Sequence, residues 1–473
     1  MSENAFAQFV ISLIQNDTSM NVHFIAIGGA AMHNLAIALH KKGFHVTGSD
    51  DEIFDPSASR LRKHGLLPEA WGWFPEKISD SLDAVILGMH ARIDNPELLE
   101  AQRKGIRIYS YPEYIYEQSK DKIRVVVGGS HGKTSITAMI LHVLRFHNKD
   151  FDYMVGAQLE GFDTMVKLTA EAPCIILEGD EYLASPIDRR PKFHLYHPHI
   201  ALISGIAWDH INVFPVFDMY LEQFKIFIDL IEKNGSLIWC DTDAHLRALS
   251  KTSGAQVTQY PYGIPKHRIA NGVSYLMPHD GVEVPLQIFG DHNLSNAEGA
   301  RLVCERLGIT AAQFYEAIQS FKGAAKRLEL VAKDEQTAIY KDFAHSPSKL
   351  MATTAAVKKQ YPDRRLVACM ELHTFSSLNE QFLEEYKDSM LAADEAIVYY
   401  NPHTIAHKKL KPITEEQVLK AFGGANLRVM TDSKALEHAL SQQDFTKANL
   451  LMMSSGTFDG ISLTELASKI LSK

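Results

Sequence analysis

A glycine-rich turn followed by Gly-Lys-Thr has the most specific chemistry in this chain. The β-branched run Val125–Val127 enters the turn, and an apolar segment typical of a helix follows from Ile136. Backbone N–H groups of such a turn, with the positive end of the next helix, hold phosphate oxygens. The lysine can reach the β- and γ-phosphates and the threonine hydroxyl can ligate Mg²⁺. We therefore predict that ATP and Mg²⁺ bind at Gly129, Ser130, His131, Gly132, Lys133, Thr134 and Ser135.

The spacing of this turn is shorter than the usual GxxxxGK[ST] pattern, because the residue five places before Gly132 is Val127. A glycine turn with a chance lysine is the alternative interpretation. The order of strand, turn, Gly-Lys-Thr and helix favours the phosphate-binding loop.

Acidic and imidazole side chains follow two other expected strands. Cys174–Leu177 ends in Glu178, and the strand after it, Ile200–Ser204, leads to Asp209 and His210. Ligands of parallel sheets bind at the carboxyl ends of strands, and Mg²⁺ prefers oxygen ligands. Glu178 is the better metal ligand, while His210 could ligate a second Mg²⁺ or cap a helix.

A second candidate phosphate site lies near the start of the chain. The strand Val22–Ile27 runs into Gly28 and Gly29, a helix follows, and the next strand ends at Asp50. This βαβ pattern suggests NAD binding, but the full GxGxxG is missing. What remains is a phosphate or diphosphate site at a helix N-terminus, or a tight turn without a ligand.

The organisation of the chain predicts an α/β protein of three domains, since 473 residues exceed one hydrophobic core. Lys120–Lys122 forms a charged hinge, and a second boundary lies near Gly323. We expect a Rossmann-like domain over 1–122, a P-loop ATPase domain over 123–323 and a Rossmann-like domain over 324–473, in which helices and strands alternate.

The composition of the chain limits its partners and its expected location. Hydrophobic content of 46% and charged content of 22% are ordinary for a globular protein, and the net charge of −9 argues against nucleic-acid binding. Four scattered cysteines fit a reducing compartment, so a cytoplasmic location is expected. There is no apolar run of about 18 residues, which argues against a membrane span. Met1–Met20 is expected to form an amphipathic helix and not a signal peptide.

A polar helix start occurs at 290–297, where His292, Asn293 and Asn296 are grouped. An asparagine amide offers the paired donor and acceptor that a purine edge requires. A capped surface helix is the alternative.

Taken together, these motifs resemble the Mur ligase family of ATP-dependent, amide-forming enzymes. The resemblance covers nearly the whole chain from about Asn21. It is carried by HFIAIGG (23–29), GGSHGKTS (128–135), EGDEY (178–182), DH (209–210), GDHNLSNA (290–297), KRLE (326–329) and KDFAHSP (341–347).

The resemblance implies a role for each site. Gly28, Gly29 and Asp50 would hold UDP-N-acetylmuramate instead of NAD. Lys133 and Thr134 would hold ATP and Mg²⁺, and Glu178 and His210 would complete the metal sites. His292, Asn293 and Asn296 would contact adenine and the surrounding loop, and Asp342 would hold the ribose. Arg327 and His345 would close over the phosphates and the intermediate, and His373 would contact the acceptor.

Two acceptors fit the family pattern. The stretches 188–198, 208–215 and 453–460 are similar to the peptidoglycan-recycling members, which join UDP-N-acetylmuramate to L-alanyl-γ-D-glutamyl-meso-diaminopimelate. The loop 371–376 departs from those members, and His373 is closer to those that add L-alanine. Gly205, Ala207 and Lys341 also depart from the pattern. We expect the murein peptide as acceptor, with L-alanine as the alternative, and a monomer or weak dimer.

Other classes share only part of these features. A P-loop kinase would use the same ATP half but release a phosphorylated product. A non-enzymatic nucleotide-binding module has no use for Lys133, Glu178 and His210 converging. An acyl phosphate made from the lactyl carboxylate and closed off by a mobile third domain accounts for all of them.

Overall fold

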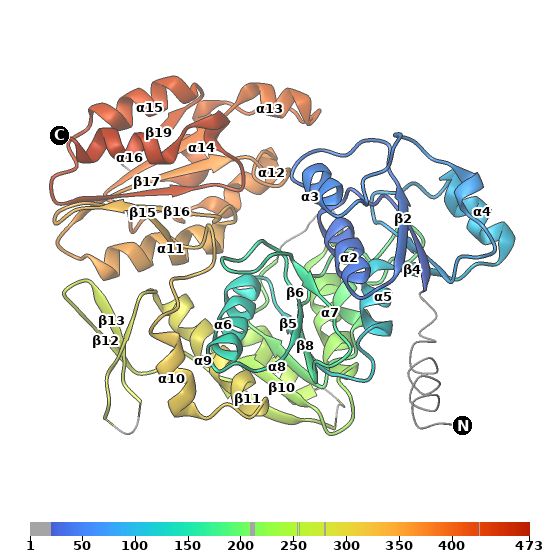
Figure 1. Ribbon diagram of the computed structural model, residues 1–473. Helices are drawn as coiled ribbons and strands as arrows, with labels where there is room; N and C mark the ends of the chain where they lie inside the picture. The colour runs from blue at the N-terminus through green and yellow to red at the C-terminus, as the bar shows by residue number, and fades with distance from the viewer. Residues whose placement is uncertain (1–19, 209–212, 253, 255, 279–280, 425) are drawn as a thin grey trace.

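The computed structural model describes residues 20–208, 213–252, 254, 256–278, 281–424 and 426–473 (Figure 1). The helix expected over Met1–Met20 falls almost wholly outside these residues, as do Asp209 and His210. Three main sheets follow one another along the chain, each combined with helices, which confirms the predicted α/β class.

The first sheet has four parallel strands in the order β2-β1-β3-β4. Its elements are β1 (Asn21–Ile25), α2 (Ala30–Lys41), β2 (His45–Ser49), α3 (Ser57–Lys63), β3 (Ala84–Leu87), α4 (Pro96–Lys104), β4 (Ile108–Ser110) and α5 (Tyr111–Glu117). The start of α4 follows from its sequence, because the Asn95 side chain accepts the N–H groups of Glu97 and Leu98 and Pro96 occupies the first helical position.

The central sheet has seven strands in the order β11-β10-β9-β5-β8-β6-β7, all parallel except the β6–β7 pair. Its strands are β5 (Ile123–Gly128), β6 (Asp152–Met154), β7 (Val166–Lys167), β8 (Cys174–Glu178), β9 (Ile200–Ile203), β10 (Ser236–Cys240) and β11 (Thr258–Tyr262). The accompanying helices are α6 (Lys133–Phe146), α7 (Phe217–Asp229), α8 (Ala244–Thr252), α9 (Asp291–Arg306) and α10 (Ala311–Ile318). The strands β5, β8 and β9 lie side by side, so the ends that carry the predicted ATP site meet at one edge.

A small antiparallel sheet of β12 (His267–Ala270), β13 (Val273–Leu276) and β14 (Val284–Leu286) extends toward the third domain (Figure 1). It touches helix α11 (Pro347–Gln360) of that domain, since the Gln360 side chain donates to the Gly272 carbonyl at 2.7 Å and accepts from Ser274 at 3.0 Å.

The third sheet has six strands in the order β15-β16-β20-β17-β18-β19, of which only the β15–β16 pair is antiparallel. The strands are β15 (Glu329–Lys333), β16 (Ala338–Asp342), β17 (Arg365–Leu372), β18 (Glu395–Tyr400), β19 (Leu427–Met430) and β20 (Ala448–Met453). Separate apolar clusters cover its two faces, one with α11 to α14 and one with α15 and α16. These helices are α11 (Pro347–Gln360), α12 (Glu380–Leu383), α13 (Pro402–His407), α14 (Glu415–Phe422), α15 (Ser433–Gln442) and α16 (Leu463–Leu471).

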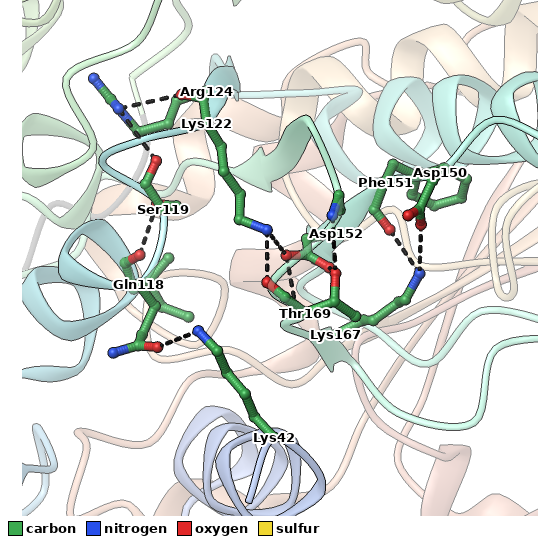
Figure 2. A network of polar contacts seen from close by, with 12 residues as sticks. Lys42, Gln118, Ser119, Lys122, Arg124, Asp150, Phe151, Asp152, Lys167 and Thr169 are labelled. Atoms are coloured by element: carbon green, nitrogen blue, oxygen red, sulfur yellow. Dashed lines mark hydrogen bonds and ion pairs between the residues drawn. The ribbon is translucent and has the colours of Figure 1, made fainter. Parts of the chain in front are cut away.

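The segment 120–122, expected to be a charged hinge, is firmly attached to the central domain (Figure 2). Lys122 is buried, and its ammonium group donates to Asp152 Oδ2 at 2.7 Å and to the Thr169 carbonyl at 2.7 Å. One lysine of the predicted charged, polar hinge is therefore buried, and a buried carboxylate from β6 compensates its charge.

Every helix in the described ranges falls short of the length and hydrophobicity that crossing a bilayer requires. All four cysteines are buried and carry free thiols.

Candidate active site

The phosphate-binding loop joins β5 to α6. Gly129 and Gly132 have φ values of +121° and +77°, which favour glycine. A Cβ at Gly132 would lie 2.5 Å from Asn296 Oδ1, so the loop also needs glycine for space. Because α6 begins at Lys133, the loop supplies free N–H groups of a helix start to a phosphate.

Lys133 is held at the loop by a buried carboxylate. Its Nζ donates to the Gly129 carbonyl at 2.6 Å and to Glu181 Oε2 at 3.0 Å, and Glu181 is fully buried. Burial alone lowers the pKa of Lys133, but Glu181, with Asp180 and Glu178, outweighs it, so the net pKa is raised. The lysine therefore stays charged.

Glu181 belongs to the functional site, although the sequence reasoning did not single it out. Its Oε1 accepts from the Tyr220 hydroxyl at 3.1 Å, and that hydroxyl contacts Ser130 Oγ at 2.8 Å. The third acid of the EGDEY motif was the available signal for Glu181. Tyr220 is distant from Glu181 in sequence, and no motif pointed to it.

Thr134 and Glu178 come together as predicted for a metal site. The Thr134 hydroxyl donates to Glu178 Oε1 at 2.7 Å, and Glu178 Oε2 accepts from Gly156 N at 2.8 Å. This pair of hard oxygens suits Mg²⁺, which uses few protein ligands and completes its shell with phosphate and water. The described residues contain no group of three or more His, Cys, Asp or Glu arranged for a metal. His210 lies outside them.

Arg327 comes to this site from the third domain. Its charge interacts electrostatically with Asp342 and Glu178, and its guanidinium carbon lies 4.7 Å from the centroid of the Phe343 ring. Burial lowers the pKa of Arg327, while the two carboxylates oppose that effect. The group remains a cation within electrostatic range of Glu178.

Asp342 and His345 shape the loop around Arg327. The Asp342 carboxylate accepts the N–H groups of Leu328 at 2.6 Å and Ala344 at 2.7 Å, and burial raises its pKa. His345 Nδ1 lies 2.8 Å from the Phe343 carbonyl. In this structure, Asp342 therefore stabilises the loop that presents Arg327.

The phosphate loop also contacts the third domain directly. His131 Nε2 and Ser348 Oγ, at the start of α11, are 2.8 Å apart. A residue predicted to hold ATP thus also joins two domains.

The polar residues at the start of α9 take different places. Asn296 stands against Gly132 of the phosphate loop. Asn293 is buried and donates to the Phe289 carbonyl at 3.0 Å. Burial lowers the pKa of His292 to about 4, with Asp291 opposing, so His292 is neutral near pH 7.

In the first domain, Asp50 closes the glycine turn. Its carboxylate accepts from Gly28 N at 2.7 Å and from Asp51 N at 3.0 Å. Burial raises the Asp50 pKa to about 6, although the Gly28 N–H opposes the shift. A Cβ on Gly28 would lie 2.8 Å from Ile53, so the turn needs glycine. Gly29 is the residue that precedes α2.

His373 lies at the carboxyl end of the third sheet, beside the loop that follows β20. His373 Nδ1 is 3.5 Å from Glu371 Oε1, and Glu371 is buried. Glu371 also accepts from Phe458 N at 2.8 Å and from the Ser454 hydroxyl. The buried carboxylate ties the 371–376 loop to the 454–458 loop.

Known proteins resemble this chain over almost its whole length. Residues 21–122 match the Mur ligase family catalytic domain, residues 127–304 the Mur ligase middle domain, and residues 326–456 the Mur ligase glutamate ligase domain. A UDP-N-acetylmuramate–L-alanine ligase of Clostridium acetobutylicum is 28% identical, covering 81% of this chain and 84% of that protein.

Two other proteins extend the comparison. A UDP-N-acetylmuramate–L-alanyl-γ-D-glutamyl-meso-2,6-diaminoheptandioate ligase of Haemophilus influenzae is 26% identical, covering 93% of this chain and 97% of that protein. The crystal structure of the UDP-N-acetylmuramate–alanine ligase MurC from Thermotoga maritima shares the fold, with a TM-score of 0.69 at 20% identity over 96% of this chain and all of that one. With three consecutive family domains around one ATP-type site, the chain belongs to the Mur ligase family of ATP-dependent, amide-forming ligases.

Proposed function

We propose that this protein joins UDP-N-acetylmuramate to the murein peptide L-alanyl-γ-D-glutamyl-meso-diaminopimelate, with ATP and Mg²⁺, in peptidoglycan recycling. The convergence of Lys133, the Thr134–Glu178 pair and Arg327 is the observation that carries the ligase chemistry. Two cations and a metal-binding oxygen pair around one phosphate loop suit phosphoryl transfer, which depends on positioning and charge neutralisation.

In the first step, a lactyl carboxylate oxygen of UDP-N-acetylmuramate attacks the γ-phosphorus, and ADP leaves. Lys133, held by Glu181, and Arg327, held above Phe343, offset the negative charge that gathers on the transferred group. In the second step, the acceptor amine attacks the acyl carbon and expels phosphate. The surplus amine proton leaves to phosphate or solvent, so the amide and inorganic phosphate balance the reaction.

An acyl phosphate must be kept from water, and contacts between the central and third domains serve this need in the proposed mechanism. His131 contacts Ser348, and Lys359 of α11 donates to Asp291 at the start of α9 at 2.6 Å. These contacts hold the third domain next to the phosphate loop, where its closure would exclude solvent from the intermediate.

The peptide acceptor is supported by the stretches that resemble the recycling members. Coverage does not separate the two acceptors, since the Haemophilus influenzae tripeptide ligase aligns along 97% of its length and an alanine ligase of Desulfitobacterium hafniense along 94%. The stretch 188–198, which resembles the recycling members, reaches the first domain through Arg190, whose guanidinium lies 3.3 Å from Glu113. The His373–Glu371 pair beside the 454–458 loop is the proposed acceptor contact, and the pair suits an ammonium or amide group.

L-Alanine is the alternative acceptor, because His373 resembles the alanine-adding pattern and the alanine ligase is slightly more identical, at 28% against 26%.

A comparison of acceptors tests the proposal. The wild-type protein is given ATP, Mg²⁺ and UDP-N-acetylmuramate with the tripeptide, with L-alanine, or with neither. We expect phosphate release and a new amide mass with the tripeptide alone. Turnover with L-alanine and not with the tripeptide would contradict the proposed acceptor and identify L-alanine instead. Many turnovers of a stable sugar phosphate ester formed without any amine would identify a kinase instead, because an acyl phosphate is labile and forms at most once per enzyme.

A further inference from the structure

Asn34 is a fully buried amide that links the first domain to the central one. Its Nδ2 donates to the Ala30 carbonyl in the first turn of α2 at 2.8 Å and contacts His33 Nε2 at 2.9 Å. Its Oδ1 accepts from Met165 N, in the central domain, at 2.9 Å. Both amide hydrogens and the oxygen therefore have partners, as a buried amide requires.

His33 fixes which way this amide points. His33 Nδ1 lies 2.9 Å from the Gly29 carbonyl, an acceptor, so Nδ1 carries the hydrogen and Nε2 accepts from Asn34. Burial lowers the pKa of His33 and keeps the ring neutral. The Asn34 oxygen can then face only Met165. The glycine turn thus sets the orientation of the group that crosses to the next domain.

The connection continues from Met165 to the metal-ligand pair. The Met165 carbonyl accepts from Val155 N at 2.9 Å, across the base of the 155–165 loop. The next residue, Gly156, donates to Glu178 Oε2 at 2.8 Å, and Glu178 Oε1 accepts from Thr134 at 2.7 Å. A Cβ on Gly156 would lie 2.8 Å from Glu178, so the loop and the carboxylate are in tight contact.

The base of the β6–β7 hairpin is fixed, as Figure 2 shows. Asp152, at the first position of β6, accepts from Lys122 at 2.7 Å and from the Thr169 N–H and hydroxyl at 3.0 and 2.8 Å. Lys167 of β7 donates to the Phe151 carbonyl at 2.9 Å. Because these contacts hold the base of the hairpin in place, we expect a displacement of Met165 to shift Gly156.

We propose that Asn34 is a positioning residue that couples occupation of the Gly28–Gly29 turn to the placement of Glu178. This inference rests on the proposed function, which puts the sugar nucleotide at that turn. A bound diphosphate fixes the start of α2, Asn34 then holds Met165, and the loop holds Glu178 in the geometry that Mg²⁺ and ATP need. By linkage, each ligand tightens the binding of the other by the same factor.

Calorimetry measures this coupling directly. UDP-N-acetylmuramate is titrated into the full chain with and without Mg²⁺ and the non-hydrolysable analogue adenosine 5′-(β,γ-imido)triphosphate. In the wild type, we expect the analogue to lower the sugar-nucleotide Kd by about five-fold or more. In Asn34→Ala, we expect the ratio of the two Kd values to fall to within about two-fold of one, with each ligand still bound alone.

Two further variants separate the coupling from general loosening. Met165→Pro removes the N–H group that donates to Asn34 Oδ1 and leaves α2 unchanged. The ratio of the two Kd values should therefore also fall to about one in this variant. Gln158→Ala is the matched control. It breaks a contact of the same loop with the first domain, to Arg60 at 2.9 Å, that does not involve the glycine turn, and should keep the ratio.

The outcomes distinguish this inference from the proposed function. The role of Asn34 would be overturned if folded Asn34→Ala or Met165→Pro kept the wild-type ratio of the two Kd values, or if the wild type itself showed no coupling. Either result would leave the ligase chemistry standing. A wild type that fails to bind UDP-N-acetylmuramate would overturn both.

Discussion

At the residue scale, the chemistry depends on charges that the fold keeps in place. Lys133 is charged because a buried Glu181 outweighs the cost of burial, and Thr134 meets Glu178 because β5 and β8 are neighbours. The sequence indicated Lys133 and Thr134 from the glycine-rich turn before a helix, and Glu178 from a strand end. It could not indicate Tyr220, which reaches Glu181 from α7, because tertiary packing sets that contact.

Removal of the Lys133 ammonium tests the phosphate loop. We expect Lys133→Ala to lower phosphate release by at least about a hundred-fold, because a preorganised charge at the transferred phosphoryl group is lost. The Kd for UDP-N-acetylmuramate should stay within about two-fold of wild type. Lys149→Ala, an exposed lysine beyond the other end of α6, is the matched control and should behave as wild type. Near-normal turnover by Lys133→Ala would refute the assignment.

At the scale of secondary-structure elements, patterns with strong local signals were predictable. Asn95-Pro96 marked the start of α4, and the glycines marked the turns into α2 and α6. The short strands β6 and β7 had no such signal, since two or three residues carry no measurable period. The burial of Lys122 had no local signal either, because its partner Asp152 is thirty residues away.

The start of α9 predicts a pH effect. The His292 pKa of about 4 lies below the ordinary 6.5, so the unfolded chain takes up the proton first as pH falls. Folding stability is therefore complete above about pH 6.5 and declines as pH falls toward 4. We expect His292→Gln to reduce the loss of unfolding free energy between pH 7 and 5 by on the order of 1 kcal/mol.

Urea unfolding at the two pH values measures the difference for His292. His438→Gln, at an exposed histidine of α15, is the control and should reproduce the wild-type loss. An unchanged loss in His292→Gln would contradict the lowered pKa of the ring.

At the scale of the whole molecule, no single domain contains the site. Lys133 and Glu178 come from the central domain, Arg327 from the third, and the glycine turn from the first. The order of motifs along the chain predicted three α/β units, because each unit has its own strand and helix pattern. The contacts between them, such as Asn34 with Met165, were not predictable, since they depend on how finished units pack.

Transfer of oxygen from the sugar carboxylate to phosphate tests the central claim most directly. UDP-N-acetylmuramate labelled with ¹⁸O in both lactyl carboxylate oxygens is turned over with ATP, Mg²⁺ and the tripeptide, and the released phosphate is analysed by mass spectrometry. If the carboxylate attacks the γ-phosphorus, each phosphate carries one ¹⁸O and the amide product keeps the other. Unlabelled phosphate accompanying amide formation would contradict activation of the carboxylate as an acyl phosphate.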